Sequence, residues 1–329
     1  MRMNLADSQQ ALGFLLQQTT FIEAEVYRIQ YPDILYPQLV PVDTSASAWA
    51  KSVTYFSLDK VGQADWLDGA ATDMRFADIN RNKFEQGIEM AGIGYRYTLE
   101  EIGQAMMVPS LNLTSERAEA ARRAYEEFMD RLARLGSHTK GTTGLLNNAN
   151  VTRTDAIADG TGTSALWSAK TADQMIRDVQ GALTNVYSGS LTVEMADTVL
   201  LPITAMELLA NTRVPNTFGN ALDYLAKYNL YTHTTGAPLT IRGILNLETA
   251  GKNGVGRLVA YRKDPRVVKL HVPMVHRFLP VWQTGPITFD IPGIFRVGSV
   301  EIRRPGAFAY VDGITAGTAP DGSGLTGTD

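Results

Sequence analysis

The chain has 329 residues, of which 44% are hydrophobic and 19% are charged, and its formal net charge is −4. This composition is typical of a folded protein, and the slightly negative net charge gives no electrostatic basis for binding nucleic acid. The absence of cysteine excludes disulfides, thiolate catalysis and zinc–thiolate sites. No apolar run approaches the roughly 18 residues of a membrane-spanning helix, so no membrane partner is expected.

The first 45 residues predict a helix followed by an extended arm. Apolar residues recur at spacings of three and four across 5–28, which indicates an amphipathic helix. Pro32, Pro37 and Pro41 follow, and each disfavours helix in the residue before it. An extended arm with no neighbouring strand in the sequence is typical of a segment that packs on another subunit.

Residues 46–94 predict a long two-stranded excursion. Across 53–58, Val53, Tyr55 and Ser57 alternate with Thr54, Phe56 and Leu58 in a sheet-like period of two. A loop rich in Gly, Ala and Asp follows at 61–73, and extended character returns across 75–97. An isolated two-stranded hairpin is barely stable in water, so its apolar side chains need cover from elsewhere. Four of them are candidates for a subunit interface: Trp66, Met74, Phe76 and Phe84.

The longest predicted helix covers residues 115–135. Before it, Thr98 and Glu101 form a capping box, which predicts a short helix. Within 115–135 an apolar stripe recurs at spacings of three and four, and oppositely charged residues lie four apart. We expect this helix to lie on a surface as a strut about 30 Å long.

The middle of the chain alternates helices and buried strands. Residues 141–167 are rich in turn formers, a helix starts at Thr171, and 197–202 is typical of a buried strand. Two further helices are expected at 203–214 and 217–229. This alternation favours a mixed α and β fold.

The last third predicts mainly strands. Residues 244–265 are expected to form a hairpin whose turn carries an Asn-Gly pair. Strand patterns continue across 267–274 and 287–304 and resume at 307–314. Residues 317–329 contain no apolar anchor and are expected to be disordered.

Few residues suggest chemistry. Arg303 and Arg304 fit either an exposed strand edge or an intersubunit salt bridge, and both interpretations stay open. His271 and His276 lie five residues apart in a strand region, so they are expected to face opposite ways and do not favour a shared metal ion. We therefore expect no catalytic, metal-binding or cofactor-binding residue, and a structural protein rather than an enzyme.

Two glycine-rich stretches leave a nucleotide-binding alternative open. Residues 160–165 match G-x-G-x-x-A by letters, but a polar stretch precedes them in place of a hydrophobic strand. Residues 136–144 contain Gly, Thr and Lys without the order of a P-loop. A two-domain α/β enzyme or nucleotide-binding protein would need one of these stretches at a helix N-terminus in a concave pocket.

Four segments, spread over nearly the whole chain, carry a resemblance to a known family. They are IQYPDILYPQLVPVDTSASAWAKSVTYFSLDKVGQADWL (29–67), GIGYRYTLEEIGQA (92–105), GTTGLLNNANV (141–151) and RRPGAFAYVDGI (303–314). In these segments and their order, the chain resembles the major capsid proteins of tailed bacteriophages with the Hong Kong 97 fold, in the branch called major capsid family protein.

The resemblance implies an α+β, Hong Kong 97-like capsid fold with a characteristic division of the chain. The expected parts are an N-terminal helix and arm (1–45), an E-loop region (46–94), a peripheral or P domain (95–165) with its spine helix (115–135), an axial or A domain (166–265), late strands that return to the P domain and link it to the A domain (266–316), and a disordered tail (317–329).

The resemblance also implies the function. Such a chain self-assembles as pentamers and hexamers into an icosahedral head shell, which encloses the phage genome without sequence-specific DNA binding. It is found in the virion, after assembly in the host bacterial cytoplasm, and scaffolding, portal or decoration proteins are candidate partners. Each contact between copies buries modest area, and many such contacts add up to a closed shell.

Other assemblies remain alternatives. An encapsulin-type nanocompartment shell protein shares this fold but holds a cargo protein, while tail-tube and decoration proteins are usually smaller and richer in strands. Some relatives cross-link a loop lysine to an asparagine of a neighbour. Lys51, Lys60 and Lys83 lie in or near the loop, but no partner asparagine can be assigned.

Overall fold

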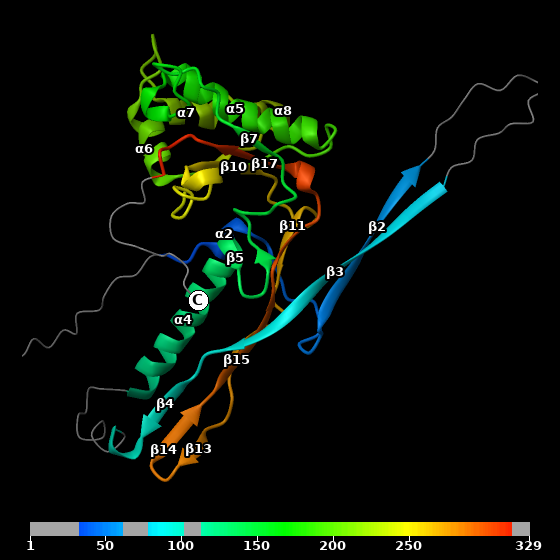
Figure 1. Ribbon diagram of the computed structural model, residues 1–329, viewed down its shortest axis with the longest axis vertical. Coiled ribbons are helices and arrows are strands. Elements are labelled where there is room, and N and C mark those ends of the chain that lie inside the picture. Colours follow the sequence, from blue (N-terminus) through cyan, green and yellow to red (C-terminus); the bar gives the residue numbers. More distant parts are fainter. Residues whose placement is uncertain (1–32, 62–77, 102–112, 318–329) are drawn as a thin grey trace, which may run out of the picture. The chain divides into compact units, whose positions relative to one another are not determined.

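The computed structural model describes residues 33–61, 78–101 and 113–317, and those from Ile34 onward belong to one unit (Figure 1). None of the helices in these ranges is long and apolar enough to cross a membrane. The helices are α2 (Tyr36–Leu39), α4 (Leu113–Leu135), α5 (Ala172–Gly189), α6 (Ile203–Asn211), α7 (Ala221–Lys227) and α8 (Leu230–Thr235), with short 3-10 turns at Trp167–Ala169, Lys252–Gly254 and Pro305–Ala307.

A five-stranded sheet forms the largest core. Its order is β7 (Arg153–Asp155), β17 (Phe308–Asp312), β10 (Arg257–Tyr261), β8 (Thr198–Leu201) and β9 (Thr240–Gly243). The central strand β10 is antiparallel to both neighbours, whereas the two outer pairs are parallel. Every residue of β8, β10 and β17 is buried, as in sheets that are covered on both faces.

Alternation along these strands separates two hydrophobic clusters. Val199 and Leu258 join the cluster of α5, whereas Leu200 and Val259 join the cluster that includes α4. Tyr261, on the α4 side, donates from its hydroxyl to the carbonyl of Leu39 at 2.7 Å. Because side chains alternate along each strand, both faces of this sheet are buried, each against a different hydrophobic cluster.

Strand β3 (Asp78–Gly92) belongs to two pairings (Figure 1). Its first ten residues form a hairpin with β2 (Ser52–Val61), and its last five pair with β15 (Gly293–Gly298). With β12 (Met274–Phe278) on the other side of β15, these strands make the four-stranded sheet β12-β15-β3-β2.

Four successive late strands enter four different sheets. Strand β14 (Thr288–Ile291) pairs with β13 (Trp282–Gly285) and β4 (Tyr95–Thr98), and β15 pairs with β3. Strand β16 (Val300–Ile302) pairs with β11 (Val268–His271), which also carries the two-residue β1 (Val42–Asp43), and β17 enters the five-stranded sheet. The short ribbon β5 (Gly136–Ser137) with β6 (Thr142–Thr143) completes the strands.

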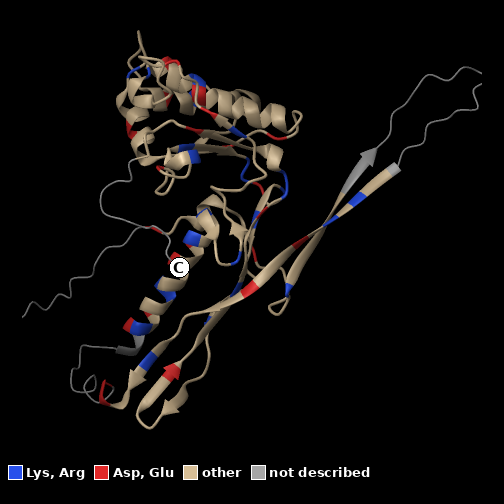
Figure 2. Cartoon of the chain, viewed as in Figure 1, with Lys and Arg blue, Asp and Glu red and all other residues tan. Residues whose placement is uncertain are grey.

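Helix α4 confirms the predicted strut at 115–135. Tyr125 and Leu132 of the predicted stripe are buried, and Met129 and Ala133 beside them are buried as well. The predicted ion pair between Asp130 and Arg134 is present at 2.5 Å. Figure 2 shows charged residues of both signs along this helix.

Local capping predictions are also confirmed. Thr98 N–H donates to Glu101 at 3.0 Å, and Glu101 N–H donates to the Thr98 hydroxyl at 3.3 Å. A second capping box, between Thr171 and Gln174, starts α5 where a helix was expected.

The arm expected to be extended across the three prolines instead contains α2. Pro37 lies in the first turn of this helix, where its missing N–H is no loss. Asp130 of α4 accepts hydrogen bonds from the backbone N–H groups of Leu35 and Tyr36 at 3.1 and 2.9 Å. A contact about 95 residues away in sequence thus overrides the local preference.

The hairpin predicted at 244–265 is wrong. Its turn is present, with positive φ at Asn253 and Gly254, but β10 pairs with β8 and β17 rather than with the residues before the turn. The helix expected at 217–229 is present but shorter, as α7 (Ala221–Lys227). A separate helix, α8, follows it, capped by Asn229, which accepts from Thr232 N–H at 2.8 Å. The predicted helix at 5–28 and nearly all of the predicted tail at 317–329 lie outside the described residues.

Candidate functional site

The β2–β3 hairpin carries aromatic contacts on both of its faces. The pairing runs from Ser52 opposite Gly87 to Val61 opposite Asp78. On one face Tyr55 stacks on its partner Phe84, with ring centroids 5.0 Å apart. On the other, the guanidinium carbon of Arg81 lies 3.7 Å from the ring centroid of Phe56, a cation–π contact.

Despite these contacts, apolar side chains of the hairpin remain exposed to solvent. Ile79 is 60% exposed, Phe56 50% and Phe84 45%. Single exposed apolar residues are ordinary, but several along one hairpin make it a candidate interaction surface. Of the four predicted interface residues, Phe84 is therefore placed on exposed surface, and the other three, Trp66, Met74 and Phe76, lie outside the described residues.

Two predicted candidates, Phe84 and Arg303, meet through a residue that the sequence did not single out. The guanidinium carbon of Arg303 lies 4.7 Å from the ring centroid of Tyr55, which stacks on Phe84. Arg303 also donates to Glu301 at 3.1 Å. Arg304 instead donates to Glu194 of the same chain. Both arginines thus have partners within the subunit.

Glu301 links this contact to a buried histidine. His271 Nε2 lies 2.7 Å from Glu301 Oε2, and both side chains are almost fully buried. Burial alone would raise the pKa of Glu301, but the hydrogen bonds and charges of His271 and Arg303 outweigh it and lower the pKa below its ordinary value. The cluster therefore ties β11 and β16 together with a charged carboxylate.

The two spaced histidines lie in different strands of different sheets, His271 in β11 and His276 in β12, rather than on opposite faces of one strand. His276 stacks on Tyr125 of α4 with centroids 5.2 Å apart, whereas His271 lies beside Asp43 of β1 at 3.8 Å. Hydrogen bonds from Ser45 and then from Lys269 lower the pKa of Asp43 well below its usual range. Within the described ranges, no group of three or more His, Cys, Asp or Glu side chains could hold a metal ion.

The G-x-G-x-x-A stretch forms a turn held by buried charge. Gly160 N–H donates to the Ser164 carbonyl at 2.9 Å. Next to it, the Lys170 ammonium lies 2.6 Å from Asp178 and 3.2 Å from Asp159. Asp178 also accepts from the Trp167 indole at 2.9 Å. The glycines thus serve a tight, ion-paired turn.

The other glycine-rich stretch, 136–144, follows the C-terminal end of α4 rather than the start of a helix. Gly136 has a φ of 76°, which is typical of the residue that ends a helix. A helix C-terminus carries partial negative charge and repels phosphate. This location is opposite to what the nucleotide-binding alternative requires.

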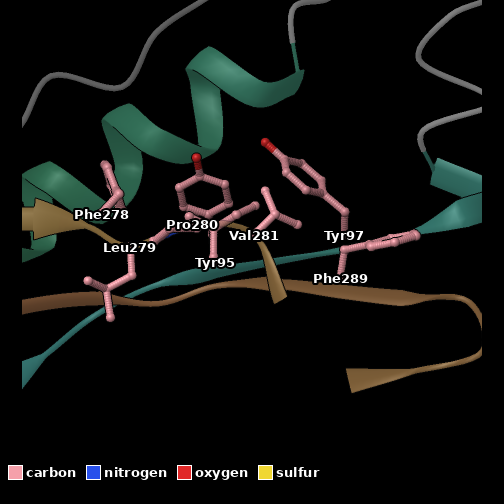
Figure 3. A pocket seen from close by; sticks show the side chains of 8 residues that line it. Tyr95, Tyr97, Phe278, Leu279, Pro280, Val281 and Phe289 are labelled. Carbon is pink, nitrogen blue, oxygen red and sulfur yellow. The ribbon is translucent and has the colours of Figure 1, made fainter. Parts of the chain in front are cut away.

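A pocket lies elsewhere, between β4, β14 and the segment before β13 (Figure 3). It has a volume of about 520 Å³ and is lined by Tyr95, Tyr97, Phe278, Leu279, Pro280, Val281, Phe289 and Ile291. Figure 3 shows the rings of Tyr95 and Tyr97 coming from the same strand, and their centroids are 5.4 Å apart. Its lining contains no charged residue, so it suits apolar side chains rather than a nucleotide.

The family model of the major capsid protein matches residues 62–314, which is most of the chain. The chain belongs to the major capsid protein family. The match covers the hairpin return strand, the strut helix, the five-stranded sheet and the late strands. No curated protein sequence matches the chain.

Solved structures agree with the family. The capsid of Myoviridae phage XM1 superposes with a TM-score of 0.74 at 18% identity, over 91% of this chain and 98% of that one. Structures from Mycobacterium phage Bobi and Microbacterium phage Oxtober96 each have a TM-score of 0.60, at 15% and 14% identity, over 98% and 95% of this chain and 100% and 99% of theirs. The α+β capsid fold predicted from the sequence is confirmed.

The family sets the biological role. As a major capsid protein, the chain is a head-shell protein, its copies assemble into a shell, and it is a component of the virion. Family and fold point to a structural rather than a catalytic role. The three solved structures all come from bacteriophages, which favours a phage shell over the nanocompartment alternative.

Proposed function

We propose that copies of this chain assemble into pentamers and hexamers of the head shell through the β2–β3 hairpin, whose apolar side chains are covered by neighbouring subunits. The observation that carries the proposal is the exposed apolar surface of this hairpin, at Phe56, Ile79 and Phe84. A two-stranded ribbon gains little stability alone, so its length serves contact with another molecule.

In this proposal the chain has the parts of its family. Residues 1–45 are the N-terminal arm, 46–94 the E-loop, 95–165 the P domain with spine helix α4, 166–265 the A domain, and 266–316 the late strands that join the P and A domains, with 317–329 as a tail. Support comes from the late strands themselves, because β14 and β15 pair with β4 and β3, while β17 pairs with β10.

The finer functional expectations follow from the same assembly. The shell assembles in the host cytoplasm and encloses DNA without reading its sequence, and scaffolding, portal or decoration proteins are its further partners. The chain catalyses no reaction in this role. Each contact between copies need bury only a modest area, since every subunit makes several contacts at once.

The test compares assembly of the purified wild type with that of two variants, by analytical ultracentrifugation and negative-stain microscopy. Wild type is expected to form closed particles, pentamers or hexamers. Deletion of residues 61–74, and the double substitution Phe56→Ser with Phe84→Ser, should leave a folded subunit that assembles poorly. Glu127→Gln, on the exposed face of α4, is the control and should assemble normally. Normal assembly of the deletion would refute the role of the hairpin.

A further inference from the structure

The sheet β12-β15-β3-β2 has two faces of different character. On one face Phe295 of β15 packs edge-on against Tyr125 and Phe128 of α4, with centroids 4.8 and 5.5 Å apart. Side chains alternate along a strand, so the next residue, Arg296, points away from α4. Arg296 therefore lies on the second face of the sheet.

Arg296 is a buried cation with no counter-charge among the described residues. It is only 8% exposed, and its guanidinium reaches two backbone carbonyls, those of Ala48 and Ile88, both at the long distance of 3.4 Å. Its Nε atom has no hydrogen-bond partner. Buried charges are normally paired, because an unpaired one loses its hydration without compensation.

A second arginine extends from the same face into water. Arg277 of β12 is opposite Ile294, one diagonal step along β15 from Arg296. Its neighbours His276 and Phe278 contact each other and the α4 side of the sheet, so Arg277 points the other way. Its guanidinium carbon lies 6.0 Å from the ring centroid of Trp49, and no carboxylate of the described residues pairs with it.

Exposed apolar residues border these two cations. Trp49 is 62% exposed, and Met90, which is opposite Arg296 in the register, is 54% exposed. An apolar border beside an arginine is typical of contacts between proteins, whereas a duplex backbone requires several exposed cations. Here one of the two cations is buried behind the segment that contains Ala48.

We infer that Arg277, exposed on this face beside Trp49 and Met90, receives a carboxylate of a second copy of this chain, and that the buried Arg296 adds positive potential from behind it. Guanidinium groups match carboxylates in geometry and charge. A chain with 34 acidic and 30 basic residues supplies carboxylates in excess, and head-shell assembly brings copies together. The inference rests on the assembly proposed above and adds to it a contact of electrostatic chemistry.

Zero-length cross-linking tests which molecule supplies the carboxylate. Particles are assembled from a mixture of ¹⁴N- and ¹⁵N-labelled subunits carrying Arg277→Lys, treated with a carbodiimide, and digested for mass spectrometry. The expected product is an amide between the new lysine and an Asp or Glu of the other isotopic form. Amides that join only peptides of one isotopic form, or no amide at position 277, would overturn the inference.

A charge reversal measures the importance of the contact. Arg277→Glu is expected to reduce the yield of particles at least tenfold while the thermal unfolding of the isolated subunit stays unchanged. Arg266→Glu reverses another exposed arginine, outside this sheet, and should assemble like wild type. Wild-type yield from Arg277→Glu would refute this inference alone, leaving the hairpin proposal intact. A wild type that never assembles would refute both.

Discussion

The five-stranded sheet and the β2–β3 hairpin are both made of paired strands, yet they use their side chains in opposite ways. In the sheet, β8, β10 and β17 are buried on both faces by two hydrophobic clusters. In the hairpin, apolar residues on both faces remain in contact with water. The same backbone pattern thus serves stability of the subunit in one region and, in the function proposed above, contact between subunits in the other.

The comparison shows that the apolar character of a strand residue does not reveal whether that residue is buried in the core or exposed on the surface. Leu200 and Ile79 are both aliphatic residues in strands, but Leu200 is fully buried and Ile79 is 60% exposed. Substitutions in the sheet should therefore reduce the free energy of unfolding of the isolated subunit. Substitutions in the hairpin should change assembly while altering that free energy little.

The largest effect on the subunit is expected at the buried ion pair of the sheet. Asp312 accepts two hydrogen bonds from Arg257, at 2.6 and 2.9 Å, and both side chains are buried. Asp312→Asn leaves Arg257 without a counter-charge and should lower the free energy of unfolding by about 3–5 kcal/mol, measured by urea denaturation. The matched control is Asp290→Asn, which removes the exposed pair with Arg96 and should lower the free energy of unfolding far less. Equal losses would contradict the prediction.

A cavity in the sheet should have the next largest effect. Leu200 is fully buried in the cluster shared with α4, so Leu200→Ala removes apolar contacts that the surroundings cannot restore. We expect a loss of about 2–5 kcal/mol in the free energy of unfolding. Calorimetry or urea denaturation of the subunit measures it, and a loss below about 1 kcal/mol would show that this face of the sheet is less well packed than described.

Lowering the pH should have a smaller effect on the stability of the subunit. This effect acts through Glu301, whose partner Arg303 contacts Tyr55 of the hairpin. The pKa of Glu301 is lowered from an ordinary value of 4.5, so its ionised form is favoured in the folded subunit. The associated stability is present above that pH and is lost as the pH falls through the lowered value. Wild type should therefore lose more stability between pH 5 and pH 3 than Glu301→Gln does. Urea denaturation at both pH values makes the comparison, and parallel losses would contradict it.

The smallest effect on the subunit is expected in the hairpin. Ile79→Ala shortens an exposed aliphatic side chain and should change the free energy of unfolding by at most about 1 kcal/mol. The same measurement as for Leu200→Ala gives a direct comparison of two aliphatic truncations. A loss as large as that of Leu200→Ala would mean that the hairpin is part of the core of the subunit.

Several elements could be predicted from the sequence because their signals are local. The strut helix follows from spacings of three and four, and the capping box at Thr98 follows from the Thr and Glu three residues apart. A helix was also expected to start at Thr171, where α5 begins. The hairpin follows from alternation on either side of a loop. The fold itself was predicted through its resemblance to a family rather than through these periodicities.

Other features depend on partners far away in the sequence. The predicted hairpin at 244–265 fails because β10 finds its partners at Thr198–Leu201 and Phe308–Asp312. At the candidate site, Phe84 was identified from its apolar character, but its link to Arg303 passes through Tyr55, which the pattern does not distinguish from other strand aromatics. The burial of Arg296 has no sequence signal, since an arginine in a strand usually faces water.

By itself, the amino-acid sequence determined the strut helix, the start of α5 and the two strands of the hairpin, because spacing and capping act over a few residues. Only the tertiary structure decided which strands are neighbours, which apolar residues are buried and which charges are paired. A strand has the same local pattern whichever strand it joins, so its partner is chosen by the burial and hydrogen bonding of the folded whole. That choice left the hairpin exposed and left Arg296 without a counter-charge among the residues that the structure describes.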